Sequence, residues 1–83
     1  MNTPQWLDKN NMKISLDARP LLAQGVHPLE RVQMECASLQ PGEIFEIITP
    51  FPPSPMIEKM AAGGFKTHSE TGADGLFHTY FCK

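Results

Sequence analysis

The sequence lacks the features that would place it in several common functional classes. Its two cysteines, Cys36 and Cys82, are too few for a disulfide framework and form no Cys-x-x-Cys pair. It has seven Lys and Arg against nine Asp and Glu, with no basic run, which argues against nucleic-acid binding because that affinity comes from neutralised phosphates. No apolar run approaches the roughly 20 residues of a membrane span. We therefore expect neither nucleic acid nor a membrane as a partner.

Motifs of familiar enzymes are also missing from the sequence. There is no Gly-x-Ser-x-Gly and no His-Glu-x-x-His. Gly63-Gly64 follows a predicted helix, whereas a phosphate-binding loop would precede one. We therefore expect no enzymatic activity and no cofactor. The first residues lack the basic and apolar regions of a signal peptide, so we expect a cytoplasmic protein of bacterial type.

The residues that are present suffice for one small domain. The chain is 41% hydrophobic, and its eight prolines stand between apolar runs and not in a low-complexity block, so disorder is not expected beyond the ends. Residues 1–12 are polar and aperiodic and predict a flexible N-terminal tail, with Trp6 and Leu7 able to dock on the domain. The domain itself is predicted to span residues 13–83.

Four segments carry strand patterns. Residues 13–17 alternate polar and apolar, which is typical of a short strand with one buried face. Residues 43–49 are apolar on both faces and predict a central strand. Residues 65–71 and 76–82 predict two further strands, and the Gly-Ala-Asp-Gly sequence at 72–75 between them is typical of a hairpin turn.

Two segments carry helix patterns. Pro28 suits the first turn of a helix, which Pro41-Gly42 ends, and residues 19–27 before it are expected to form a loop. The apolar stripe of this helix contains Leu29, Val32, Cys36 and Leu39. A second helix over 55–62 follows the proline-rich link 50–55, with Ser54 as its N-cap. The residues expected to be buried on it are Ile57, Met60 and Ala61.

The element order is thus β-α-β-α-β-β. It predicts an α+β fold, a two-layer α/β sandwich in which two helices lie on one face of a four-stranded mixed sheet. The other face would be less covered. Ile44 and Ile48 share that face with Glu46, which motivates the expectation of a weak homodimer through it.

Several short motifs, in this order and spacing, resemble the TusA/SirA-like sulfur-carrier superfamily. They are Leu16-Asp17-Ala18-Arg19, Pro28-Leu29-Glu30, Leu39-Gln40-Pro41-Gly42-Glu43 and the link Pro50-Phe51-Pro52-Pro53-Ser54-Pro55, followed by Gly64-Phe65. The resemblance covers about residues 14–83. More narrowly, the chain looks like a branch of that superfamily whose function is unknown.

The resemblance implies the fold but not the carrier activity. Carriers of this type have Cys-Pro-x-Pro at the mouth of the first helix, and the cysteine carries a persulfide. In this sequence the matching positions hold His27, Pro28 and Glu30, so the cysteine and the second proline are absent. An imidazole does not hold a sulfane sulfur in that way. We therefore expect a small binding or adaptor module.

The expected binding surface surrounds the mouth of the first helix. Its candidate residues are His27, Pro28, Asp17, Arg19, Phe51 and Pro53. The helix dipole disfavours a positive charge on His27, which either contacts a ligand as neutral imidazole or caps the loop. Asp17 and Arg19 either contact a partner or form a salt bridge where the strand ends. Phe51 either packs or contacts a partner. The expected partner is a protein or a small anionic ligand.

Two other functions stay open. Cys82, expected to be exposed near a chain end, could serve a divergent sulfur or redox carrier if a cation activated it, or it is an ordinary strand residue. Cys36, on the buried stripe, is expected to be structural. His68 and His78 could join Cys82 and His27 in a metal site if the hairpin register places them on one face, whereas another register separates them.

Overall fold

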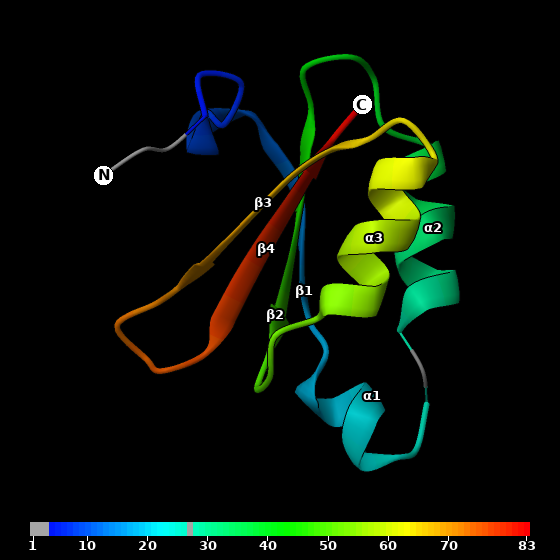
Figure 1. Cartoon of the computed structure of the whole chain (residues 1–83), viewed down its shortest axis with the longest axis vertical. Coiled ribbons are helices and arrows are strands. Elements are labelled where there is room, and N and C mark those ends of the chain that lie inside the picture. Colours follow the sequence, from blue (N-terminus) through cyan, green and yellow to red (C-terminus); the bar gives the residue numbers. More distant parts are fainter. Residues whose placement is uncertain (1–3, 27) are drawn as a thin grey trace.

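The computed structural model describes residues 4–26 and 28–83. Its strands and longer helices follow the predicted order β-α-β-α-β-β, and one short helix is added after the first strand (Figure 1). The strands are β1 (Met12–Asp17), β2 (Ile44–Thr49), β3 (Lys66–Thr71) and β4 (Phe77–Cys82). The helices are α1 (Arg19–Ala23), α2 (Leu29–Ala37) and α3 (Ser54–Ala62), and a short 3-10 turn, η1, spans Lys9–Asn11. The α+β class and the four-stranded mixed sheet are confirmed.

The sheet has the strand order β1-β2-β4-β3. β1 runs parallel to β2, and the other two pairs are antiparallel. β2 is a central strand, as its two apolar faces predict, and β4 is the other. Phe45 lies opposite Phe81 and Glu46 lies opposite Tyr80, so successive residue pairs point alternately to the two faces of the sheet.

α2 and α3 lie side by side on one face of the sheet and enclose the main core (Figure 1). The fully buried members of this core are Ala18, Val32, Cys36, Leu39, Phe45, Ile47, Met56, Met60 and Phe81. Each large apolar side chain buried here contributes on the order of 1.5–3 kcal/mol. Among the described residues, every helix is too short or too polar to span a lipid bilayer.

The four residues of the predicted stripe all face the core, but α2 ends at Ala37, so Leu39 is buried just beyond it and Leu29 is only half-buried. The buried face of α3 differs from the prediction. Met56 and Met60, four residues apart, are the buried residues of α3. Ala61 is exposed and Ile57 is only half-buried. The helix begins at Ser54 itself and Pro53 holds the N-cap position. The methionines lie on one face because side chains at i and i+4 share a face.

The prediction of a loop over residues 19–27 is wrong for its first part, because α1 occupies Arg19–Ala23. Pro20 stands in the first turn of α1, where its missing N–H costs nothing. The Leu22 amide donates to the carbonyl of the buried Ala18 at 2.9 Å. Leu22 packs against the main core, so tertiary contact supports a helix too short to be stable alone.

The N-terminal segment crosses the face of the sheet opposite the helices (Figure 1). Leu7 is buried there, and Trp6 packs beside it. Together they cover Ile44, Tyr80 and Cys82. The expected homodimer through Ile44 and Ile48 thus loses Ile44 as a contact, because this side chain is fully buried within one chain.

Candidate functional site

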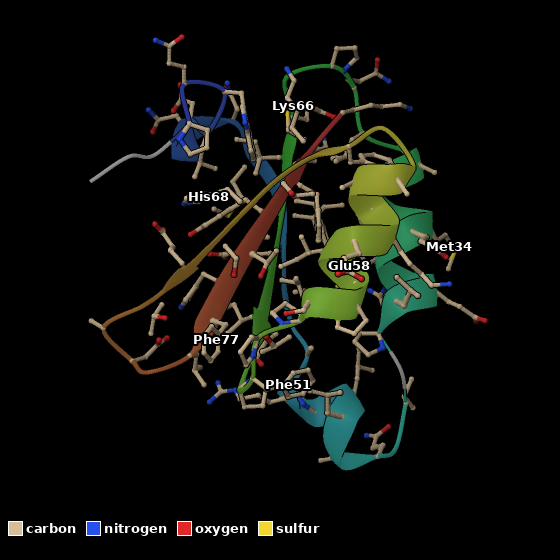
Figure 2. The ribbon with its side chains drawn as sticks, in the orientation of Figure 1. Met34, Phe51, Glu58, Lys66, His68 and Phe77 are labelled. Atoms are coloured by element: carbon tan, nitrogen blue, oxygen red, sulfur yellow. The ribbon has the colours of Figure 1, made fainter. Side chains whose placement is uncertain are left out.

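The described residues form an apolar cavity where α2 and α3 begin. Its volume is about 300 Å³. It is lined by Leu22, Pro28, Leu29, Thr49, Phe51, Pro53, Pro55 and Met56. We call it the helix-mouth cavity. Its walls come from α1, the starts of α2 and α3, and the link that follows β2, and Phe51 lies close to α1 at this end of the molecule (Figure 2).

The shape of the helix-mouth cavity is set by prolines and one hydrogen bond. Pro28 and Pro53 are buried next to the two helix starts, and their rings fix the backbone φ angle. Thr49 is fully buried, and its Oγ1 donates to the carbonyl of Phe51 at 2.6 Å. This bond holds the link against β2. The Phe51 side chain remains 46% exposed at the rim of the cavity.

The lining of the helix-mouth cavity carries no charge among the residues that the structure describes. Its polar side chain, that of Thr49, already uses its hydroxyl hydrogen on the Phe51 carbonyl. The three lining prolines have no backbone N–H. The cavity therefore suits an apolar group and offers little to an anion.

Asp17 and Arg19 form the predicted salt bridge with each other. Arg19 Nη2 lies 2.7 Å from Asp17 Oδ2, and Arg19 Nε lies 3.0 Å from Asp17 Oδ1. The hydrogen bond from the Arg19 side chain lowers the pKa of Asp17 to about 2. Neither residue lines the helix-mouth cavity.

The predicted binding residues are thus only partly brought together. Pro28, Phe51 and Pro53 meet in the helix-mouth cavity. The prediction for His27 lies outside the described residues. Pro55 belongs to the proline-rich link, and Met56 has the adaptable side chain that suits partner contacts, so the sequence indicates both. The lining residues that the sequence did not name as binding residues are Leu22, Leu29 and Thr49. Of these, Leu22 could have been recognised from the sequence, because a leucine is too apolar for the solvated loop that was expected at this position and so indicates a packed or partner-facing side chain.

A second, polar cluster lies on the sheet face opposite the helices, and the sequence did not predict it. Glu46 is only 8% exposed. The Ser15 hydroxyl donates to Glu46 Oε1 at 2.6 Å, and His78 Nδ1 lies 3.0 Å from Glu46 Oε2. The other ring nitrogen of His78 lies 3.2 Å from Asp74 Oδ2. Because both ring nitrogens face carboxylates, the surroundings of His78 favour the imidazolium form, in which both nitrogens carry a hydrogen.

The hydrogen bonds of this cluster set its protonation states. Burial would raise the pKa of Glu46, but hydrogen bonds from Ser15, His78 and Tyr80 lower it overall. Burial would lower the pKa of His78, but the carboxylates of Glu46 and Asp74 raise it overall. Burial and the neighbouring Glu46 raise the pKa of Tyr80. The raised pKa of His78 therefore favours its charged form, and both of its ring nitrogens have a carboxylate partner.

The two histidines of the hairpin lie on one face, as one of the two registers predicts. His68 pairs with Tyr80, and their rings stack with centroids 6.4 Å apart, while His78 pairs with Glu70. In the part of the chain that the structure describes, no three His, Cys, Asp or Glu side chains are placed to hold a metal ion. The part that His27 would take in the expected metal site lies outside the described residues.

The cysteines differ from the expectation in one respect. Cys82, expected to be exposed, is 2% exposed and lies beneath Trp6 and Leu7. Cys36 is fully buried, and burial raises the pKa of its thiol to about 12. Neither thiol is presented to solvent as a reactive carrier would require.

Comparisons with protein-family models, with curated proteins and with solved structures find no match for this chain. Function must therefore be inferred from the site itself, because a fold alone does not determine it.

Proposed function

We propose that the chain is a non-enzymatic binding module whose helix-mouth cavity takes up an apolar side chain of a protein partner. The observation that carries this proposal is an open cavity of about 300 Å³ with an uncharged, almost wholly apolar lining. This volume stands at the lower end of the range for ligand sites. It suits a single aliphatic or aromatic anchor better than a larger ligand.

A protein partner is favoured over a small anion by the surroundings of the cavity. The nearby cation Arg19 is held by Asp17 and is not among the lining residues. Phe51 stands 46% exposed at the rim, where it can extend the contact beyond the cavity. Because Pro28 and Pro53 stiffen the walls, little conformational entropy is lost when a partner binds.

The resemblance to the TusA/SirA-like superfamily is compatible with this proposal. The α+β class and the two helices on one sheet face agree with what that resemblance implies. The cavity includes Pro28, directly after the position where a carrier would hold its cysteine. Membership of the superfamily and a cytoplasmic location remain parts of the proposal. The burial of Cys82 speaks against the alternative of a sulfur carrier that uses this residue.

The proposal is tested by titrating the ¹⁵N-labelled chain with N-acetyl-leucine amide and N-acetyl-phenylalanine amide. We expect the backbone amide signals of Leu22, Leu29 and Met56 to shift and to saturate with a Kd of about 1 mM or weaker, as befits one anchor without its partner. Inorganic phosphate is titrated in parallel. Shifts of these amides with phosphate alone would contradict the proposal in favour of an anion.

Two variants make the test specific. Phe51→Ala removes part of the rim and is expected to weaken binding of both amides several-fold, because aromatic contacts around an anchor exclude water. Met34→Ala is the matched control, since Met34 is 65% exposed on α2 and lies outside the cavity (Figure 2). Equal loss in the two variants, or shifts scattered over the surface, would show that the cavity is not the binding site.

A further inference from the structure

The outer edge of β3 is a regular strand edge that is open to pairing. Within residues 4–26 and 28–83, β3 pairs with β4 alone and ends the strand order β1-β2-β4-β3. Its residues, Lys66–Thr71, include no proline, and its register with β4 has no irregularity. Edge strands are usually protected by prolines, bulges or charged side chains, above all lysine. β3 has no proline or bulge, and its charges, Lys66 and Glu70, are of opposite sign, so they exclude another strand only where like charges would meet.

The hairpin fixes which backbone groups of β3 point outward. The Gly72 amide donates to the Leu76 carbonyl at 2.9 Å, which makes these residues a hydrogen-bonded pair. Hydrogen-bonded and non-hydrogen-bonded pairs alternate along antiparallel strands. The residues bonded to β4 are then Lys66, His68 and Glu70. The residues whose amide and carbonyl groups point to the open edge are Thr67, Ser69 and Thr71.

We propose that two copies of the chain pair antiparallel through β3, about a twofold axis that passes beside His68. In this register Thr67 of one protomer forms the backbone hydrogen bonds with Ser69 of its partner, so outward groups meet outward groups. Lys66 of each protomer lies opposite Glu70 of the other. The result is one continuous sheet across the dimer, with a self-complementary interface.

Charge complementarity identifies a second copy as the occupant and selects the register. Lys66, His68 and Glu70 pair with Cys82, Tyr80 and His78 of β4. They therefore lie on the sheet face opposite the helices, where Tyr80 and Cys82 are buried, and His68 is labelled on that side in Figure 2. Glu70 is placed there by Tyr80, whose hydroxyl lies 3.4 Å from its carboxylate. The proposed register forms two opposite-charge pairs, one on each side of the axis. A shift by two residues would place Lys66 opposite Gly72 and lose both pairs.

The other edge of the sheet is less suited to such pairing. β1 has a register irregularity between Met12 and Ile14. The irregularity disturbs the row of backbone groups that a second strand would need.

Sedimentation equilibrium tests the affinity of the proposed dimer. An edge-strand contact is small, so we expect the average mass to rise from 9.3 kDa toward twice that value between about 10 μM and about 1 mM protein. Lys66→Glu places like charges opposite each other and is expected to weaken the dimer about tenfold or more. Adding Glu70→Lys exchanges the charges and is expected to restore it. A monomer at all concentrations, or a dimer unaffected by Lys66→Glu, would overturn the proposal.

Disulfide trapping tests the register. A thiol introduced by His68→Cys would face its own copy across the axis in a non-hydrogen-bonded pair, where Cα atoms lie close enough for a disulfide. We expect oxidation to link this variant into a covalent dimer. Ser69→Cys is the matched control and is expected to link poorly, because it lies off the axis. The native cysteines are buried and provide little background. Linking of Ser69→Cys in preference to His68→Cys would overturn the register.

Discussion

His78 on β4 contacts Glu46 on the neighbouring strand β2. Its Nδ1 lies 3.0 Å from the Glu46 carboxylate, although the two residues are 32 positions apart in the chain. Its Nε2 reaches Asp74 in the hairpin turn. One imidazole ring therefore ties β4 to β2 and to the turn that leads into β4. Its charged form is favoured in the folded state, because folding brings the distant Glu46 carboxylate to the ring beside the local Asp74.

We predict that the stability of the chain falls as the pH rises above neutrality, and that His78 is the cause. The carboxylates raise the pKa of His78 in the folded state. Its contribution is therefore fully present below the unfolded pKa of about 6.5 and is lost as the pH rises through the raised folded value. The free energy of unfolding, measured with urea at about pH 6 and about pH 9, should decrease over this interval.

His78→Gln should remove most of this pH dependence and should lower stability at pH 6 by about 1–3 kcal/mol, because Glu46 loses a charged partner. His68→Gln is the control, since the His68 ring nitrogen Nε2 makes no hydrogen bond among the described residues and lies 3.6 Å from the carboxylate of Glu70, against 3.0 Å between His78 and Glu46. An unchanged pH dependence in His78→Gln would show that another group is responsible.

Gly72→Ala should disturb the same bridge from the other side. A Cβ atom at this position would lie 2.6 Å from His78 Nε2 and 2.8 Å from Asp74 Oδ1. The imidazole must then move away from Asp74, and we expect the pKa of His78, followed by NMR, to decrease relative to the unmodified chain. Ala73→Ser, at an exposed position of the same turn, should leave it unchanged. A His78 pKa unaffected by Gly72→Ala would contradict this steric account.

Thr49→Val should weaken ligand binding without changing the apolar lining of the helix-mouth cavity. The substitution removes the hydroxyl that holds the Phe51 carbonyl, at a cost of about 1 kcal/mol in stability. The link after β2 is then less ordered, and the Kd for N-acetyl-leucine amide should increase. Thr79→Val, which removes the buried bond to Ser69, is a control with a similar cost. Equal binding by both variants would show that this hydrogen bond does not shape the cavity.

The two thiols should react slowly with a reagent such as dithionitrobenzoate in the folded chain. Cys36 is fully buried with a pKa raised to about 12, and Cys82 is covered by Trp6 and Leu7. Both should label rapidly in denaturant. Comparison with Cys82→Ser assigns any native reaction. Rapid native labelling that this substitution abolishes would revive the interpretation of Cys82 as a sulfur or redox carrier.

Regular periodicity in the sequence predicts much of the fold. The spacing of Leu29, Val32 and Cys36 predicts the inward face of α2, since it repeats over about two turns. α1 was missed because five residues are too few to show a period, and contacts of Leu22 with the core support the helix. On α3 the burial of Met60 was predicted and that of Met56 was missed. Met56 stands next to Ile57, and Met60 next to Ala61, so the sequence is compatible with more than one orientation of the helix about its own axis.

The two sites differ in how far the sequence predicts them. Pro28 and Pro53 mark the starts of two helices. Two parallel helices on one face of a sheet bring their starts to the same end of the molecule. The sequence therefore predicts where the residues of the helix-mouth cavity meet. The bridge between Glu46 and His78 depends instead on strand register. A slip of one residue would turn His78 toward the helices, and nothing local in the sequence excludes that slip.

The position of β4 has a consequence for how the chain is made. β4 lies between β2 and β3 but follows both in chain order. While the ribosome is still adding residues 77–82, β3 has no neighbour in the sheet and Phe45 lacks its opposite residue, Phe81. Because β1 can already pair with β2, the nascent chain exposes the unpaired β3 and one edge of β2 until β4 is added between them. In that interval, association with other chains competes with folding.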